Sequence, residues 1–187
     1  MFKFVGSILA FMMLATSHPL IAFADQNDPR LDQLFSDLQT PLSDAAVKDI
    51  EEKIWAYWTN FSDDQTINDT MAIAVKMMDS GRLRSAEQIL SRIIDREPNF
   101  AEAWNKRATV RFIIGNHGES AKDIAKVLQL EPRHFGALSG LGMIQMQAGN
   151  GQSALKSYEA AFAIHPYLRN IKTLIDELKR RLKGRAL

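Results

Sequence analysis

The sequence predicts an all-α protein, a right-handed α-solenoid in which antiparallel helix pairs stack on one another. Three prolines and three glycines recur at one interval of 34 residues, namely Pro98, Pro132, Pro166, Gly81, Gly115 and Gly149. Glycine is typical of the residue after a helix, where a left-handed conformation is needed, and proline cannot continue a helix interior. Each period is therefore expected to hold two helices, with a glycine turn inside the unit and a proline turn between units.

The three periods run over 67–100, 101–134 and 135–168, and further columns agree when they are aligned. One column is small in every row (Ala74, Ala108 and Gly142), and another is large and apolar in the first two rows and aromatic in the third (Leu90, Ile124 and Tyr158). Small residues in mid-helix let the two helices of a unit approach closely. The alignment therefore predicts a tight helix pair in each unit.

This period and these columns resemble the tetratricopeptide repeat (TPR), a helix-turn-helix unit. The third row carries the resemblance best, and the stretches 104–108 and 131–142 look closest to small exported bacterial proteins with a single TPR array. The resemblance covers 67–168. It implies a protein that binds other proteins, with no strands.

Residues 1–24 form the pattern of a secretory signal peptide. Lys3 is followed by an apolar run from Phe4 to Thr16, and Ala22-Phe23-Ala24 makes an A-x-A site before Asp25. We expect cleavage after Ala24 and export, to the periplasm if the host has two membranes. The alternative is an uncleaved membrane anchor, for which the run is short because a span needs ~20 apolar residues.

The flanks of the array are predicted to be caps, because an end repeat otherwise leaves its apolar side bare. Residues 25–66 are expected to form an N-terminal cap of two helices, the second capped by Ser43, with an apolar face at Val47, Ile50, Ile54, Trp58 and Phe61. Residues 169–187 form a basic amphipathic helix and tail of net charge +5, whereas 25–64 carry −7. The terminal helix either closes the array or contacts an anionic membrane or an acidic partner through Lys179, Arg180, Arg181 and Lys183.

Composition and motifs argue against a nucleic-acid-binding, metal-binding or enzymatic function. With 23 Lys+Arg against 22 Asp+Glu, the chain lacks the strongly basic balance typical of nucleic-acid binding, so no nucleic-acid partner is expected. The chain has no cysteine, and His117, His134 and His165 form no metal-ligand spacing. No nucleophile elbow or dinucleotide fingerprint is present. We therefore expect no enzyme, no cofactor, no metal and no small-molecule substrate.

The TPR resemblance implies that positions 2, 5, 9, 12 and 13 of each first helix line a concave groove for a partner. The predicted partner-binding residues are Met71, Val75, Met78, Asn105, Thr109, Phe112, Ser139, Met143 and Met146. The same positions include Asn68, Asp79, Glu102, Ile113, Gly136 and Gln147. Methionine repacks at little cost and suits varied helices or peptides. The alternative is that the N-terminal helices fold back and bury part of this set.

Lys106, Arg107 and Arg111 are candidate polar anchors for the partner. Arg107 and Arg111 stand where large apolar residues are usual and lie one helical turn apart. The alternative is internal pairing with neighbours such as Glu119, Asp123 or Asp79. The sequence thus predicts an exported TPR adaptor or assembly factor of the cell envelope, with a membrane-surface protein as the alternative.

Overall fold

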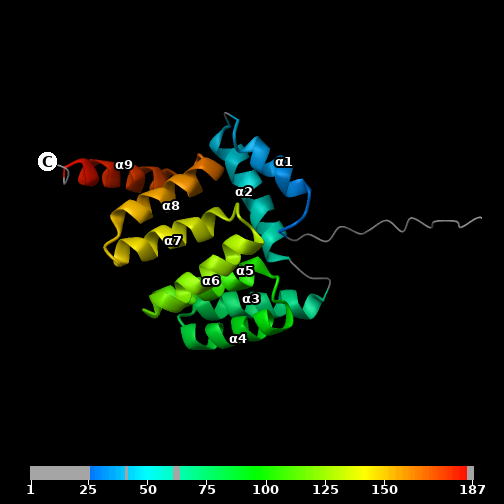
Figure 1. Ribbon diagram of the computed structural model, residues 1–187. Helices are drawn as coiled ribbons and strands as arrows, with labels where there is room; N and C mark the ends of the chain where they lie inside the picture. Colours follow the sequence, from blue (N-terminus) through cyan, green and yellow to red (C-terminus); the bar gives the residue numbers. More distant parts are fainter. Residues whose placement is uncertain (1–25, 41, 61–63, 185–187) are drawn as a thin grey trace, which may run out of the picture.

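The computed structural model describes residues 26–40, 42–60 and 64–184, which hold nine α-helices and no strand (Figure 1). The helices are α1 Arg30–Asp37, α2 Asp44–Thr59, α3 Gln65–Asp79, α4 Leu83–Arg96, α5 Ala101–Ile113, α6 His117–Leu130, α7 Phe135–Gln147, α8 Gly151–Ile164 and α9 Arg169–Lys183. The all-α prediction is confirmed. The signal-peptide prediction and Phe61 lie outside the described residues.

Helices α3 to α8 form three hairpins that stack in chain order (Figure 1). The turn inside each hairpin places its glycine in the left-handed region, with φ of +72° at Gly81, +83° at Gly115 and +73° at Gly149. The residue after each glycine donates its backbone N–H to the fifth carbonyl before it, as in Asn116 to Arg111 at 2.8 Å. The glycine turns therefore end the first helix of every unit as the sequence predicted.

The two helices of the third unit touch at a glycine. A Cβ added at Gly142 of α7 would lie 2.4 Å from the ring of Tyr158 on α8, a distance that real Cβ atoms do not show. Tyr158 is buried, and Ala154 beside it is fully buried. Gly142 of the small-residue column and Tyr158 of the large column thus face each other across one helix contact.

The carboxy-terminal helix closes the array as expected. Ile175 and Leu178 of α9 are buried against Ala154 and Tyr158 of α8. Arg180, Arg181 and Lys183 lie in its last turn, where they complement the partial negative charge of the helix end. No helix in the described part of the chain combines the length and apolarity that a membrane crossing requires.

The position of the N-terminal helices differs from the predicted cap at the start of the array. They do not stack on α3; they lie beside α5, α7 and α8, and α2 runs across the stack (Figure 1). Ser43 caps α2 as predicted, since its Oγ accepts from the N–H of Ala46 at 3.3 Å. A helical apolar stripe predicts that one face of a helix is buried but not which element buries it. The sequence therefore could not exclude a position of α1 and α2 beside α5, α7 and α8.

We term α1, α2 and the residues leading into them (26–40 and 42–59) the N-terminal clasp, because they bind both turns between units and the turn that leads into α9. Gln26 donates to the carbonyl of Asn99 at 2.7 Å in the turn between α4 and α5. Asp32 accepts from Arg133 at 2.5 Å before α7. Glu51 lies 2.5 Å from His165 before α9. The clasp therefore links segments up to 127 residues apart, as in the bond from the Tyr167 hydroxyl to Thr40.

Candidate interaction groove

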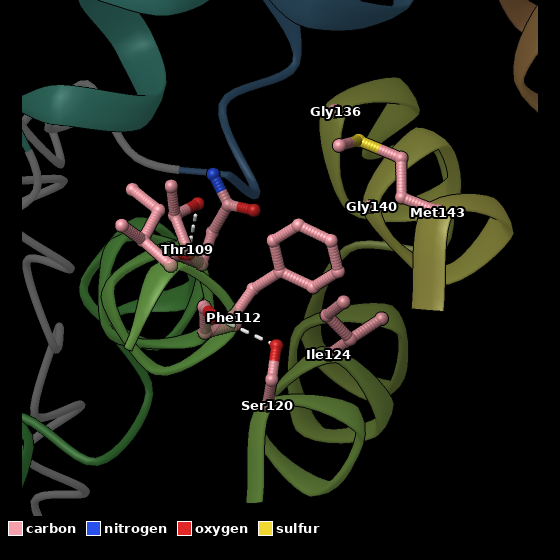
Figure 2. Close-up of a pocket in the computed structure, with 10 residues that line it drawn as sticks. Thr109, Phe112, Ser120, Ile124, Gly136, Gly140 and Met143 are labelled. Carbon is pink, nitrogen blue, oxygen red and sulfur yellow. Dashed lines mark hydrogen bonds between the residues drawn. The ribbon is translucent and has the colours of Figure 1, made fainter. Parts of the chain in front are cut away.

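An apolar cavity of about 270 Å³ opens between α5 and α7, with α6 as its floor (Figure 2). Its lining residues are Asn105, Ala108, Thr109, Phe112, Ile113, Ser120, Ile124, Gly136, Gly140 and Met143. Helices α5 and α7 are the first helices of consecutive units. The cavity therefore lies between first helices, the elements on which the sequence predicted the groove.

Two glycines on α7 make room for the cavity. Gly136 and Gly140 lie one helical turn apart, so both face α5 from the same side of α7. A Cβ at Gly140 would come 3.3 Å from the Cδ1 of Ile124, and one at Gly136 would come 3.2 Å from Trp55. Any larger side chain at either position would take up space beside the floor or the wall of the cavity.

The rim carries large apolar side chains that water reaches. Ile113 is 57% exposed and Met143 is 46% exposed, and only Ile73 matches them among the large apolar residues of the described chain. Exposed apolar side chains beside a concave apolar lining are typical of a binding site rather than of a closed core.

The polar side chains of the lining are engaged inside the protein. The hydroxyl of Thr109 donates to the carbonyl of Asn105 at 3.0 Å, and that of Ser120 donates to the carbonyl of Ala108 at 2.7 Å. The amide of Asn105 donates to Glu102 at 2.9 Å. The cavity thus offers hydrocarbon surface to an occupant.

A buried acid–base pair closes the end of the groove nearest the clasp. Glu102 and His134 are fully buried, with His134 Nε2 2.9 Å from the Glu102 carboxylate. The N–H of Ala137 donates to His134 Nδ1, so the ring proton lies on Nε2 and is donated to Glu102. Burial opposes ionisation of Glu102, but the bond to His134 and the nearby Lys106 together lower the pKa of its carboxyl.

The clasp covers this end of the groove. Trp58 is 1% exposed and stacks on His134 with ring centroids 4.2 Å apart, while Trp55 packs edge-on against Phe135 at 5.5 Å. The Lys106 ammonium lies 5.6 Å from the centre of the Trp55 ring. The first-turn positions of α5 and α7 are therefore shielded, and the groove stays open only further along these helices.

The structure brings together four of the nine predicted groove residues in the cavity: Asn105, Thr109, Phe112 and Met143. It separates the other five. Met71 is fully buried in the core of the first unit, and Met78 packs against the same core. Met146 packs against the contact between α8 and α9, whereas Val75 and Ser139 are half-buried outside the lining. The expected methionine groove is thus reduced to Met143.

Sequence reasoning missed four of the lining residues, Ala108, Ser120, Ile124 and Gly140, two of which form the floor on α6. Ala108 and Ile124 belong to the repeat columns that were interpreted as helix packing. The one available signal was the pair of glycines at 136 and 140, since two glycines one turn apart on a helix leave a hollow in its surface.

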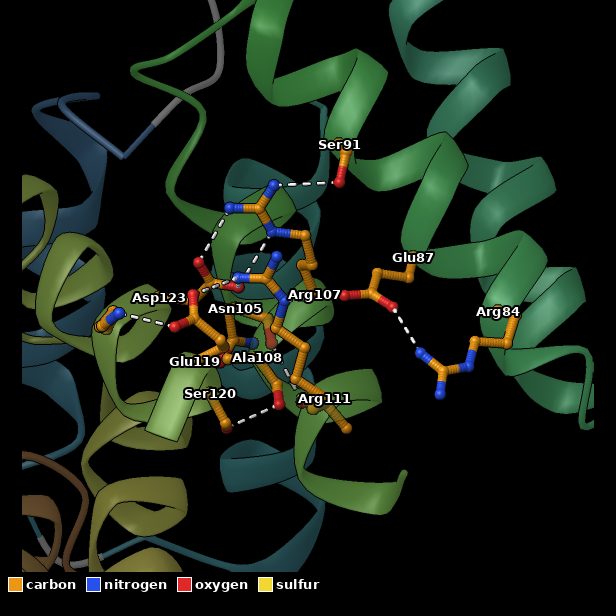
Figure 3. A network of polar contacts seen from close by, with 12 residues as sticks. Arg84, Glu87, Ser91, Asn105, Arg107, Ala108, Arg111, Glu119, Ser120 and Asp123 are labelled. Carbon is orange, nitrogen blue, oxygen red and sulfur yellow. Dashed lines mark hydrogen bonds and ion pairs between the residues drawn. The ribbon is translucent and has the colours of Figure 1, made fainter. Parts of the chain in front are cut away.

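The prediction that Arg107 and Arg111 anchor a partner requires a correction, because both pair internally (Figure 3) and neither lines the cavity. Arg107 forms a bidentate ion pair with Asp123, with both hydrogen bonds at 2.9 Å, and donates a further hydrogen bond to the hydroxyl of Ser91 on α4. Arg111 bridges Glu87 and Asp123, each at 2.9 Å. These contacts join α4, α5 and α6, so the arginines tie the first unit to the second rather than present a free charge to a partner.

Two of the four basic residues singled out on α9 form ion pairs. Lys179 pairs with Glu159 at 2.7 Å, and Arg181 pairs with Glu177. Arg180 and Lys183 are exposed. Lys106, the third predicted anchor, pairs with Glu102 at 3.0 Å. Among the described residues, no group of histidines and carboxylates is arranged to hold a metal ion.

Helix pairs with an internal glycine turn and a shared concave face define an α-solenoid of the repeat type. No family model matches the chain. A TPR repeat-containing protein of Rhizobium etli is 40% identical over 155 residues, which cover 83% of this chain and 76% of that protein. The chain belongs to the TPR family.

Solved structures share the fold. The first TPR domain of the protein Spaghetti, bound to an HSP90 peptide, matches with a TM-score of 0.61 at 17% identity, covering 65% of this chain and 96% of that one. The Yersinia enterocolitica type III secretion chaperone SycD, in complex with a peptide of the translocator YopD, matches with a TM-score of 0.60 at 10% identity. The match covers 63% of this chain and 95% of that one. MamA matches with a TM-score of 0.59 at 18% identity, and the match covers 85% of this chain and 84% of that one.

Proposed function

We propose that this TPR protein is a non-catalytic interaction adaptor or assembly factor of the cell envelope, which binds a segment of a partner protein in its concave groove. The observation that carries the proposal is the apolar cavity between α5 and α7, rimmed by the exposed side chains of Ile113 and Met143. Two solved structures of the same fold are bound to peptides, which supports a peptide-binding role for this protein.

Site-directed photo-crosslinking tests the proposal. A photoreactive residue at Met143 on the rim should crosslink one reproducible partner in living cells, whereas the same residue at the exposed Gln88 of α4 should not. Thr109→Glu, which places a charge at the cavity wall, should abolish the crosslink. Equal crosslinking from both positions, or a product unaffected by Thr109→Glu, would argue against the groove.

The envelope location rests on the sequence pattern of residues 1–24. Fractionation and intact-mass measurement test it, because cleavage after Ala24 leaves a chain that begins at Asp25. A full-length chain in the cytoplasmic fraction would refute this part of the proposal and leave the groove untouched.

The membrane-surface alternative has weaker support. The apolar stripe of α9 covers α8 through Ile175 and Leu178, so this stripe is not free to enter a lipid surface. Arg180 and Lys183 are the exposed cations that would remain for lipid headgroups. Co-sedimentation with anionic vesicles that depends on these two residues would favour the alternative.

A further inference from the structure

The cavity continues into the surface on which the clasp rests. Gly136 lines the cavity and also faces Trp55 of α2, and Asn105 lines the cavity and also donates to Glu102 beneath the clasp. The chain therefore already seats one helix, α2, across this side of the array. The cavity begins where that helix interface ends.

The lining disfavours an extended peptide as occupant. Every residue of an extended chain presents an N–H and a C=O that need hydrogen-bond partners once they leave water. The hydroxyls of Thr109 and Ser120 already donate to carbonyls of this protein, and the Asn105 amide donates to Glu102. A helix satisfies its own backbone groups and brings only side chains to such a surface.

The rim suits a helix with a continuous apolar face. Ile113 extends the apolar surface along α5, and Met143 extends it along α7. Side chains three or four residues apart on a helix point the same way. A partner helix can therefore place two of them together in a cavity flanked by two helices, while its polar face stays in water.

We propose that the partner segment is an amphipathic helix that lies beside α2 and inserts two aliphatic side chains, one helical turn apart, into the cavity. This inference rests on the proposed function and narrows its ligand to a helix with an i, i+4 or i, i+3 aliphatic pair. The ligand needs no terminal carboxylate, because no basic side chain lines the cavity.

Peptide selection tests the proposal. A phage library of random 16-residue peptides is selected against the purified protein, and synthetic winners are measured by fluorescence anisotropy and by NMR in the complex. Gly140→Leu places a large side chain in the lining of the cavity, at a position where a Cβ meets only the Cδ1 of Ile124 within 4 Å, and Thr109→Glu charges an exposed position of the wall. Gly118→Leu is the matched control, since nothing lies within 4 Å of a Cβ there.

We expect winners that share the aliphatic pair, bind as helices, and lose at least tenfold in affinity to Gly140→Leu and Thr109→Glu but less than twofold to Gly118→Leu. Winners that bind in extended form and still lose affinity to the cavity variants would overturn the helix and leave the proposed function standing. The absence of winners that depend on the cavity would overturn both. A wild-type dimer that Gly140→Leu makes monomeric, seen by light scattering, would identify a second copy as the occupant and also overturn the proposal.

Discussion

Replacement of Trp58 by alanine should detach the clasp from the turn before α7. Trp58 is 1% exposed and stacks on His134, with Phe135 5.2 Å away between ring centres. A buried tryptophan removes about 150–250 Å² from water, which at about 25 cal/mol per Å² is about 4–6 kcal/mol. Partial relaxation brings the cost of a buried Trp→Ala change to about 3–5 kcal/mol.

Thermal unfolding followed by circular dichroism measures this loss. A chain of this size loses about 2–4 °C of melting temperature per kcal/mol, so Trp58→Ala should melt about 6–20 °C lower. Trp104→Ala is the control, because Trp104 is half-buried outside the clasp and donates to the carbonyl of Pro98 at 2.9 Å.

Hydrogen exchange localises the effect. The N–H of Ala137 donates to His134 Nδ1, so its exchange should accelerate in Trp58→Ala and stay unchanged in Trp104→Ala. A stability loss below about 1 kcal/mol for Trp58→Ala, or an unchanged Ala137, would refute the packing of the clasp described above.

Three further predictions concern other buried contacts. Asp123→Ala removes the carboxylate that two arginines share and should cost about 3–5 kcal/mol in urea unfolding; a loss below 1 kcal/mol would contradict the network. The pKa of Glu102 is lower in the fold than its ordinary value of 4.5, so its stabilisation is complete above pH 4.5 and is lost as the pH falls through the folded value. Glu102→Gln should flatten the stability profile in that acid range, and an unchanged slope would oppose this. Gly142→Ala should destabilise by about 1–3 kcal/mol despite the better helix propensity of alanine, because the new Cβ meets Tyr158, whereas Gly118→Ala should not destabilise.

Periodicity predicted the helices and turns because those follow from local chemistry. Gly81, Gly115 and Gly149 each adopt the left-handed conformation that the sequence assigned to them, and Ser43 caps its helix. Such features depend on a few neighbouring residues, so a single sequence can identify them.

The groove was harder to predict because position in a repeat does not fix what covers it. Met71 and Asn105 occupy the same position in consecutive units, yet Met71 lies in a core and Asn105 lines the cavity. The course of the clasp depends on contacts between Trp58 and His134, 76 residues apart, which no local pattern encodes. The pairing of Arg107 with Asp123, which the sequence offered as the alternative to a partner anchor, by contrast joins two helices of one hairpin.

The clasp has a consequence for the order in which the chain folds. Repeat arrays are normally held by contacts between neighbours, so that units can form one after another during synthesis. Here α1 and α2, which precede the array in the chain, find their last binding surface only when His165 and Tyr167 have been made. Until then the apolar faces of α1 and α2 lack their partner, and contacts of such long range close slowly. Helices α1 and α2 are therefore made before the repeat array but complete their packing only after its last turn has formed.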